Sequence, residues 1–132
     1  MPLGSHGFVL CPHLTMQRIH SVSQILPQVM ELPVDNIDLE LSARDDDLLP
    51  LLLEGGTFDR DISFGLVDVH SGEIEAKEVV LERIGQAIEA FSGDRLWFDP
   101  DCGLKNRSLE EAQKKLEVVV EAVQEARDAA GE

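Results

Sequence analysis

The most constraining feature of this sequence is a repeated alternation between short apolar segments and helix-like segments, at intervals of about 30 residues. Strand-like segments are expected over residues 7–11, 36–41, 62–69 and 95–99. Strands that alternate with helices form parallel sheets joined by right-handed crossovers. The pattern therefore predicts an α/β fold, with a single domain over residues 1–132.

Each predicted strand is followed by a predicted helix. Two helices are expected over residues 21–31, where Pro27 implies a kink or a later start, and over residues 48–53. The third helix has an apolar stripe and a stop at Gly93, and the stripe consists of Val80, Ile84, Ala87, Ile88 and Phe91. Four β/α units form either half of an eight-unit TIM-type barrel, a parallel (βα)4 half of a (βα)8 barrel, or a small open sheet.

The last helix begins with a clear local signal. Ser108 and Glu111 have the S-x-x-E spacing of a capping box, in which each residue caps the backbone N–H of the other. The predicted inner face of this helix consists of Leu109, Ala112, Leu116, Val119 and Val123. A solvated acidic outer face is expected at Glu117, Glu121 and Glu125.

The charge balance excludes several classes of partner. The chain has 26 acidic and 11 basic residues, for a formal net charge of −15. Nucleic acids and anionic membranes bind clusters of Lys and Arg, and the sequence has none, so neither is expected as a partner. An apolar run of the roughly 20 residues that a membrane helix needs is also absent. With no signal-peptide pattern at its start, the chain is expected in the cytoplasm.

Residues with metal-binding or catalytic side chains recur where the predicted strands end. Parallel α/β folds place their active sites at the carboxyl ends of strands. From one unit to the next, the positions 13, 40, 70 and 102 are 27, 30 and 32 residues apart. The candidates are Cys11 and His13, Glu40, Asp68 and His70, and finally Asp99, Asp101 and Cys102. One β/α unit separates each candidate from the next, so all of them are expected at one mouth.

Two thiols, an imidazole and a carboxylate are a donor set that zinc accepts in tetrahedral geometry. Cys11 and Cys102 lie 91 positions apart in a chain with no secretory signal, which favours metal or catalytic use over a disulfide. Taken singly, a cysteine is more often a small buried apolar residue, and a glutamate is more often an ion-pair partner. The matching positions at strand ends favour the zinc interpretation.

Three segments resemble a known family. Residues 99–105, which read D-P-D-C-G-L-K, are similar to the cysteine segment of the cobalamin-independent methionine synthases. Residues 65–73 resemble the D-x-H-S segment of that family, and residues 35–40 resemble the strand that supplies its glutamate ligand. The resemblance runs from about Val9 to the end of the chain. It implies the last four β/α units of a zinc-bearing catalytic barrel.

The resemblance also implies a reaction and roles for individual residues. Zinc held by His, two Cys and Glu would keep the homocysteine thiol as a thiolate, which takes a methyl group from a methyl-folate polyglutamate. Cys102 and Glu40 match two of the family's ligands. His70 matches a histidine near the leaving group, expected to donate a proton, and Asp68 matches an acid that shapes the same site. The chemistry is sound, because a metal-bound sulfur is deprotonated at neutral pH and remains nucleophilic.

The first strand departs from the family pattern. The family reads H-x-C there, whereas this chain reads Cys11-Pro12-His13. Either the two ligands have exchanged places, or Cys11 matches the family's cysteine and Val9 replaces its histidine. Residues two apart on a strand point to the same face, so an exchanged pair could still bind one metal ion. In the second case one ligand is lost, and zinc would bind weakly or not at all.

Two further expectations concern assembly and function. Four β/α units leave two open sheet edges, which predicts a homo-oligomer or a complementary half-barrel chain. Such a partner is expected to bury apolar inner faces of the strands that contain Val9, Ile37, Phe64 and Leu96. Two alternatives to methionine synthesis remain open. They are a truncated or degenerate fragment without catalysis, and a related zinc-thiol transferase with another methyl donor or thiol.

Overall fold

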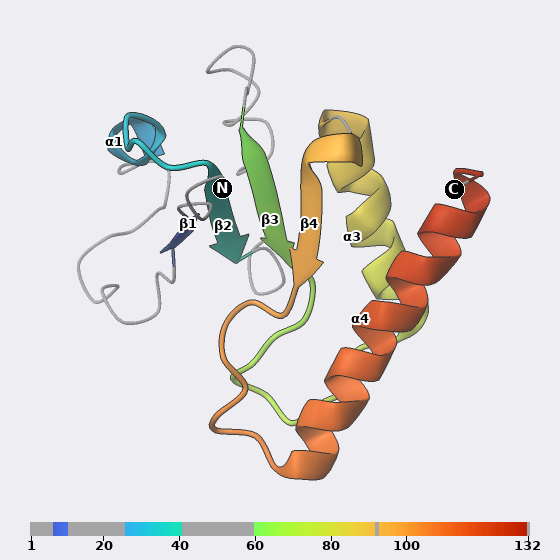
Figure 1. The fold of residues 1–132 in the computed structure, drawn as a ribbon. Helices are drawn as coiled ribbons and strands as arrows, with labels where there is room; N and C mark the ends of the chain where they lie inside the picture. The colour runs from blue at the N-terminus through green and yellow to red at the C-terminus, as the bar shows by residue number, and fades with distance from the viewer. Residues whose placement is uncertain (1–6, 11–25, 41–59, 92, 132) are drawn as a thin grey trace, which may run out of the picture.

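The computed structural model describes residues 7–10, 26–40, 60–91 and 93–131 (Figure 1). In chain order, the elements are β1 (Gly7–Leu10), α1 (Leu26–Met30), β2 (Asn36–Glu40), β3 (Asp61–Gly65), α3 (Lys77–Ala90), the 3-10 turn η3 (Gly93–Arg95), β4 (Leu96–Asp99) and α4 (Leu109–Ala129). The predicted helix over residues 48–53 and the predicted start of the first helix lie outside the described residues. No helix in the described ranges is long and apolar enough to cross a membrane.

The four strands form one parallel sheet in the order β1-β2-β3-β4, which confirms the predicted parallel α/β fold. Glu40 pairs in register with Gly65, and Gly65 pairs with Asp99. The last residues of β2, β3 and β4 therefore lie side by side at the carboxyl edge of the sheet. This edge is where the sequence predicted the candidate site residues.

One face of the sheet is apolar and packs against helices of the same chain. Ile37, Ile62 and Phe64 are completely buried, with Val29 from α1 and Ala87 from α3 in the same cluster. Alternate residues point to opposite faces of a strand, so the other face carries the polar side chains Asn36, Asp38, Ser63 and Asp99. The prediction that a partner chain buries these apolar faces is therefore wrong at Ile37 and Phe64, which are already covered within this chain, whereas Leu96 on β4 is only partly buried.

Helix α3 largely follows its predicted stripe. Val80, Ile84 and Ala87 are buried, but Ile88 is 46% exposed and does not belong to the inner face. The helix ends at Ala90, before the predicted stop at Gly93. Its next residue, Phe91, turns into extended backbone, and its ring lies 5.6 Å from the ring of Phe64.

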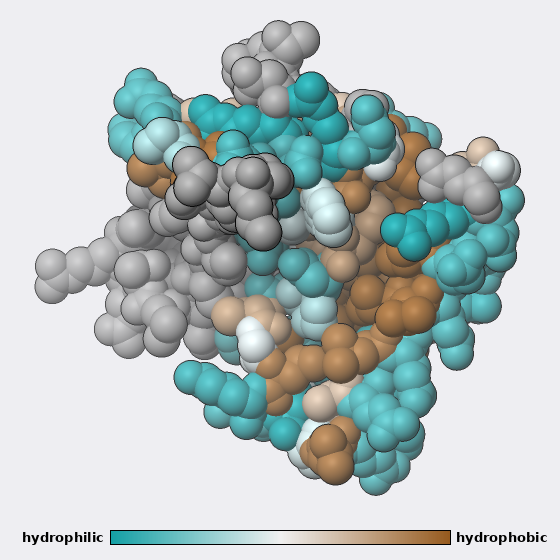
Figure 2. All heavy atoms as spheres, in the orientation of Figure 1, coloured by the Kyte–Doolittle hydropathy of each residue, from teal (hydrophilic) through white to brown (hydrophobic). Residues whose placement is uncertain are grey.

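Helix α4 has its predicted cap, and its inner face matches the prediction only in part. The Ser108 hydroxyl accepts from the Glu111 N–H and the Glu111 carboxylate accepts from the Ser108 N–H, which confirms the capping box. Leu109 and Leu116, predicted to face inward, are 87% and 44% exposed. Val119 is buried as predicted, and the predicted Ala112 and Val123 are partly buried. The other buried positions, Lys115 and Ala122, were not predicted. The expected acidic outer face at Glu117, Glu121 and Glu125 is exposed, as Figure 2 shows for the outer side of this helix.

Strand β3 ends at Gly65, four residues earlier than predicted. The chain beyond it stays buried at Leu66 and Val67 and remains hydrogen-bonded to the segment that follows β4. The Leu66 N–H donates to the Asp99 carbonyl at 2.8 Å, and the Asp101 N–H donates to the Val67 carbonyl at 3.0 Å. Asp68 and His70 are therefore on a loop, three and five residues beyond the strand end.

Candidate functional site

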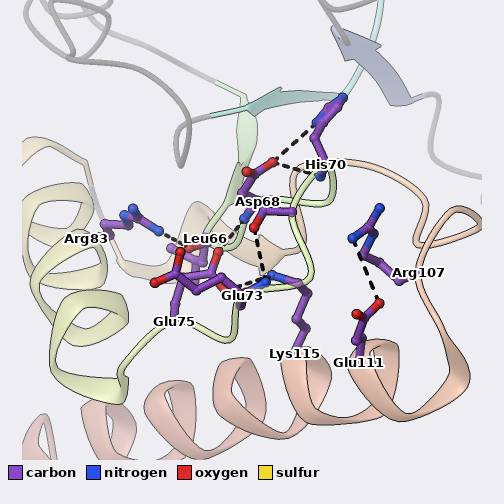
Figure 3. Close-up of polar contacts among 10 residues, drawn as sticks. Leu66, Asp68, His70, Glu73, Glu75, Arg83, Arg107, Glu111 and Lys115 are labelled. Atoms are coloured by element: carbon purple, nitrogen blue, oxygen red, sulfur yellow. Dashed lines mark hydrogen bonds and ion pairs between the residues drawn. The ribbon is translucent and has the colours of Figure 1, made fainter.

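The loop after β3 brings Asp68 and His70 into direct contact. Oδ1 of Asp68 accepts from the backbone N–H of His70 at 2.8 Å and lies 3.3 Å from Nδ1 of the imidazole (Figure 3). An ionised carboxylate can only accept, so a hydrogen bond in this contact requires a proton on Nδ1, and Nε2 is then the nitrogen that Asp68 does not engage. The predicted pairing of Asp68 with His70 in one site therefore has a specific geometry, with His70 exposed at the surface.

Glu75 and Lys115, neither of which the sequence pattern indicated as a site residue, hold this loop from its inner side. The backbone N–H of Asp68 donates to Glu75 Oε1 at 2.8 Å. Nζ of Lys115, on α4, lies 3.1 Å from Glu75 Oε2 and donates to the Glu73 carbonyl at 2.5 Å. The sequence did contain a signal for Lys115. It lies four residues before Val119 and seven before Ala122, so it falls on the same buried face of the helix, where a lysine needs a partner.

Gly72 lets the same loop lie against the start of α4. A side chain at this position would collide with the carboxylate of Glu111 and come within 3.4 Å of Nη1 of Arg107. Those two residues form an ion pair of 3.8 Å, and Glu111 is also part of the capping box. The loop that carries His70 is therefore in contact with α4 at two places, one turn apart.

The segment after β4 carries Asp101 and Cys102. Asp101 is buried, and its Cα lies within 2.5 Å of the place where a side chain at Gly65 would begin. Only a glycine at the end of β3 allows this close approach. Cys102, the next residue, is exposed. The segment thus presents the Cys102 thiol beside the carboxyl edge of the sheet.

A pair of acids occupies the polar face beneath this edge. Asp38 of β2 and Asp99 of β4 are close enough for the Asp38 side chain to affect the pKa of Asp99. Burial raises the pKa of Asp99 to about 6, and the hydrogen bond with Asp38 acts in the opposite direction. The sequence predicted Asp99 at the site but did not indicate Asp38. The two residues lie on strands that flank β3, and only the order of the strands in the sheet brings them near each other.

The predicted zinc ligands are only partly within the described chain. Cys11 and His13 lie outside it. Glu40 is the last residue of β2, and its side chain is not among those described. In the ranges that the structure describes, no group of three His, Cys, Asp or Glu side chains is arranged to hold a metal ion. Zinc binding through Cys11, His13, Glu40 and Cys102 stays a prediction.

Comparison with known proteins places this arrangement in a family. The family described as "Cobalamin-independent synthase, Catalytic domain" matches residues 14–125. The chain belongs to this family. The methionine synthase of Saccharolobus islandicus is 37% identical over 106 residues, covering 80% of this chain and 32% of the relative. An Arabidopsis thaliana protein named 5-methyltetrahydropteroyltriglutamate--homocysteine methyltransferase 2 is 30% identical over 109 residues, covering 83% of this chain and 14% of the relative.

The fold is shared with a solved member of the family. A B12-independent methionine synthase from Shewanella sp. W3-18-1, in complex with selenomethionine, matches with a TM-score of 0.71 at 22% sequence identity. The match covers 81% of this chain and 30% of that chain. This cobalamin-independent synthase segment therefore spans about a third or less of these relatives.

Proposed function

We propose that this chain forms the zinc-binding part of a methionine synthase barrel, a parallel (βα)4 half of a TIM-type (βα)8 barrel. The reaction would transfer a methyl group from methyltetrahydrofolate polyglutamate to the thiol of homocysteine. The observation that carries the proposal is the Asp68–His70 pair, held on the loop after β3 in a chain that belongs to this family. Cytoplasmic location belongs to the same proposal.

The donor types at the strand ends fit zinc. Glu40 ends β2 at the carboxyl edge, and Cys102 follows β4 at the same edge with an accessible thiol. We propose that these two residues hold the ion together with Cys11 and His13, as an exchanged form of the family's H-x-C pair. Bound zinc would lower the pKa of the substrate thiol, so that it reacts as a thiolate at neutral pH.

His70 is proposed as the proton donor and Asp68 as its partner. With Nδ1 facing the carboxylate, Nε2 is the nitrogen placed to deliver a proton to the amine of the departing folate. Asp68 is proposed to orient the ring through its Oδ1 contacts with Nδ1 and with the backbone N–H of His70. Other methyl donors and other acceptor thiols stay open as alternatives. Protonation of the leaving group by His70 requires only a basic atom on that group, whatever the remainder of the donor molecule is.

The complete activity is proposed to need more than this chain. The chain spans 32% of the Saccharolobus relative, and β1 and β4 are the outer strands of its sheet. A closed barrel of eight strands would pair both of them. We therefore propose a homo-oligomer or a complementary half-barrel chain as partner. The same coverage supports the second candidate, a non-catalytic fragment or subunit.

One experiment separates these candidates. Zinc content and methyl transfer are measured for the chain alone and for the chain mixed with the remaining segment of the Saccharolobus relative, and light scattering gives the mass relative to 14.6 kDa. Methyl-folate is compared with methylcobalamin as donor. We expect close to one zinc per site, a mass above the monomer, and activity with methyl-folate only in the mixture.

Two variants make the assignment of roles specific. Cys102→Ser is expected to lower zinc content more than any other single change. His70→Asn is expected to slow turnover on the order of a hundredfold with zinc content unchanged. Loss of zinc in the His70 variant would make it a ligand, and zinc at background level in the unmodified chain would favour the non-catalytic fragment.

A further inference from the structure

Lys115 lies in the middle of α4 with its side chain completely buried. A charged ammonium group is removed from water only at a large cost unless charged or polar partners replace the water. Within the described part of the chain, its partners come from the loop that carries His70. Nζ donates to the Glu73 carbonyl at 2.5 Å and pairs with Glu75 Oε2 at 3.1 Å.

Glu75 transmits this contact towards the imidazole. Its two oxygens serve two donors, since Oε2 faces Lys115 and Oε1 accepts from the Asp68 N–H at 2.8 Å. Asp68 then accepts from the backbone N–H of His70 and contacts Nδ1 of its ring through the same oxygen. Four residues thus connect the interior of α4 to an exposed imidazole through consecutive polar contacts, which Figure 3 shows as one chain of dashed lines.

We propose that Lys115 is a positioning residue for His70, acting through Glu75 and Asp68. The catalytic meaning of this role depends on the proposed function, but the contacts themselves can be tested without catalysis. Lys115 supplies the charge that fixes Glu75 in place. Glu75 then fixes the backbone of Asp68, and Asp68 selects the orientation and tautomer of the ring.

Substitution of Glu75 by glutamine tests the bridge without changing its shape. A carboxylate accepts from two donors with two oxygens, whereas an amide has one accepting oxygen and one donating nitrogen. In Glu75→Gln, the single oxygen is expected to turn towards the charged Lys115, because hydrogen bonds from charged donors are stronger. The amide nitrogen would then face the Asp68 N–H, and that backbone group would lose its acceptor.

Removing Lys115 from this variant should restore the lost contact. In the double variant Glu75→Gln with Lys115→Met, nothing competes for the amide oxygen, so it can accept from Asp68 again. The proposal therefore predicts opposite effects for one substitution. In the wild-type background, Lys115→Met leaves Glu75 without its cation and should reduce the exchange protection of the Asp68 N–H. In the Glu75→Gln background, the same substitution should increase that protection.

The experiment measures amide hydrogen exchange by NMR on the full chain, together with the ring signals of His70. We expect exchange at the Asp68 N–H to become about tenfold or more faster in Glu75→Gln, since a lost bond to a charged group shifts local opening by that order. The double variant should recover most of the protection. The His70 ring signals should move in Glu75→Gln and return towards wild type in the double variant.

Lys114→Met is the matched control, since Lys114 neighbours Lys115 on α4 and pairs only with the exposed Glu110 in the contacts described. It should leave the Asp68 and His70 signals unchanged. The proposal is overturned if Glu75→Gln leaves the Asp68 exchange rate unchanged, or if the double variant is no better protected than Glu75→Gln. Failure of zinc binding or methyl transfer would refute the proposed function but would leave these exchange rates unaffected.

Discussion

The two faces of the sheet are built on different principles. The face towards α1 and α3 is apolar, and residues such as Ile37, Ile62 and Phe64 are buried together in one cluster. The polar side is organised by single pairs, such as Asp38 with Asp99, and the loop beyond its edge by Lys115 with Glu75. Apolar packing is non-directional, so many sequences satisfy it, whereas each polar pair needs one particular partner. The apolar layer therefore determines the fold, and the polar contacts determine where the site residues point.

The largest stability loss is expected in the apolar layer. Phe64 is completely buried between the sheet and α3, against the ring of Phe91. Phe64→Ala should lower the free energy of unfolding by about 4 kcal/mol, because it removes a large transfer term and leaves a cavity. Urea unfolding followed by circular dichroism measures this. Trp97→Ala, at an exposed position of β4, is the control. A loss below that of the control would mean that the apolar layer does not stabilise the sheet.

A smaller loss is expected when one polar pair is broken. Lys115→Met keeps the length of the side chain but leaves Glu75, which is 15% exposed, without its cation. Breaking a buried pair typically costs 3–5 kcal/mol, and the partial access of Glu75 to water should reduce this to about 2 kcal/mol. The same unfolding measurement applies, with Lys114→Met expected to leave the midpoint unchanged. A stabilised Lys115→Met variant would show that the pair orients the loop at a net cost to folding.

The Asp38–Asp99 pair predicts a dependence on pH. Burial raises the pKa of Asp99 from 3.8 to about 6, so between these values the folded chain holds a proton that the unfolded chain has lost. Stability from this group is therefore greatest below about pH 4 and falls as the pH rises towards 6. Asp99→Asn should remove that loss and stabilise the metal-free chain at pH 7 by about 1 kcal/mol, a value reduced for solvent screening at this partly exposed site.

The measurement is urea unfolding of the metal-free chain at pH 4 and pH 7, with Glu89→Gln on the exposed side of α3 as the control. The difference between Asp99→Asn and wild type should grow from pH 4 to pH 7. An equal difference at pH 4 and pH 7 would show that ionisation of Asp99 does not contribute to the pH dependence of stability.

The sequence predicted the features that depend on the spacing of apolar residues along the chain and on interactions between residues close in sequence. Four strands in parallel order, the buried stripe of α3 and the Ser108–Glu111 cap all follow from such local signals. Contacts that link distant segments could not be predicted. Lys115 meets Glu75 across 40 residues. Asp38 and Asp99 come near each other only because β2 and β4 flank β3 in the sheet and both residues lie on its polar face. The early end of β3 also escaped prediction, since the apolar run that follows Gly65 is buried without continuing the strand.

The smallest effect is expected where the predicted and observed faces of α4 differ. The sequence pattern put Leu116 on the inner face, but it is 44% exposed, and the buried position three residues later is Val119. Leu116→Gln should therefore change the free energy of unfolding by less than about 0.5 kcal/mol, as exposed substitutions do. Val119→Gln places a polar group in the layer between α3 and α4, and it should cost at least about 2 kcal/mol. Urea unfolding of the two variants compares them directly. Equal losses would mean that α4 is rotated from the orientation described here, and Lys115 would then no longer face Glu75.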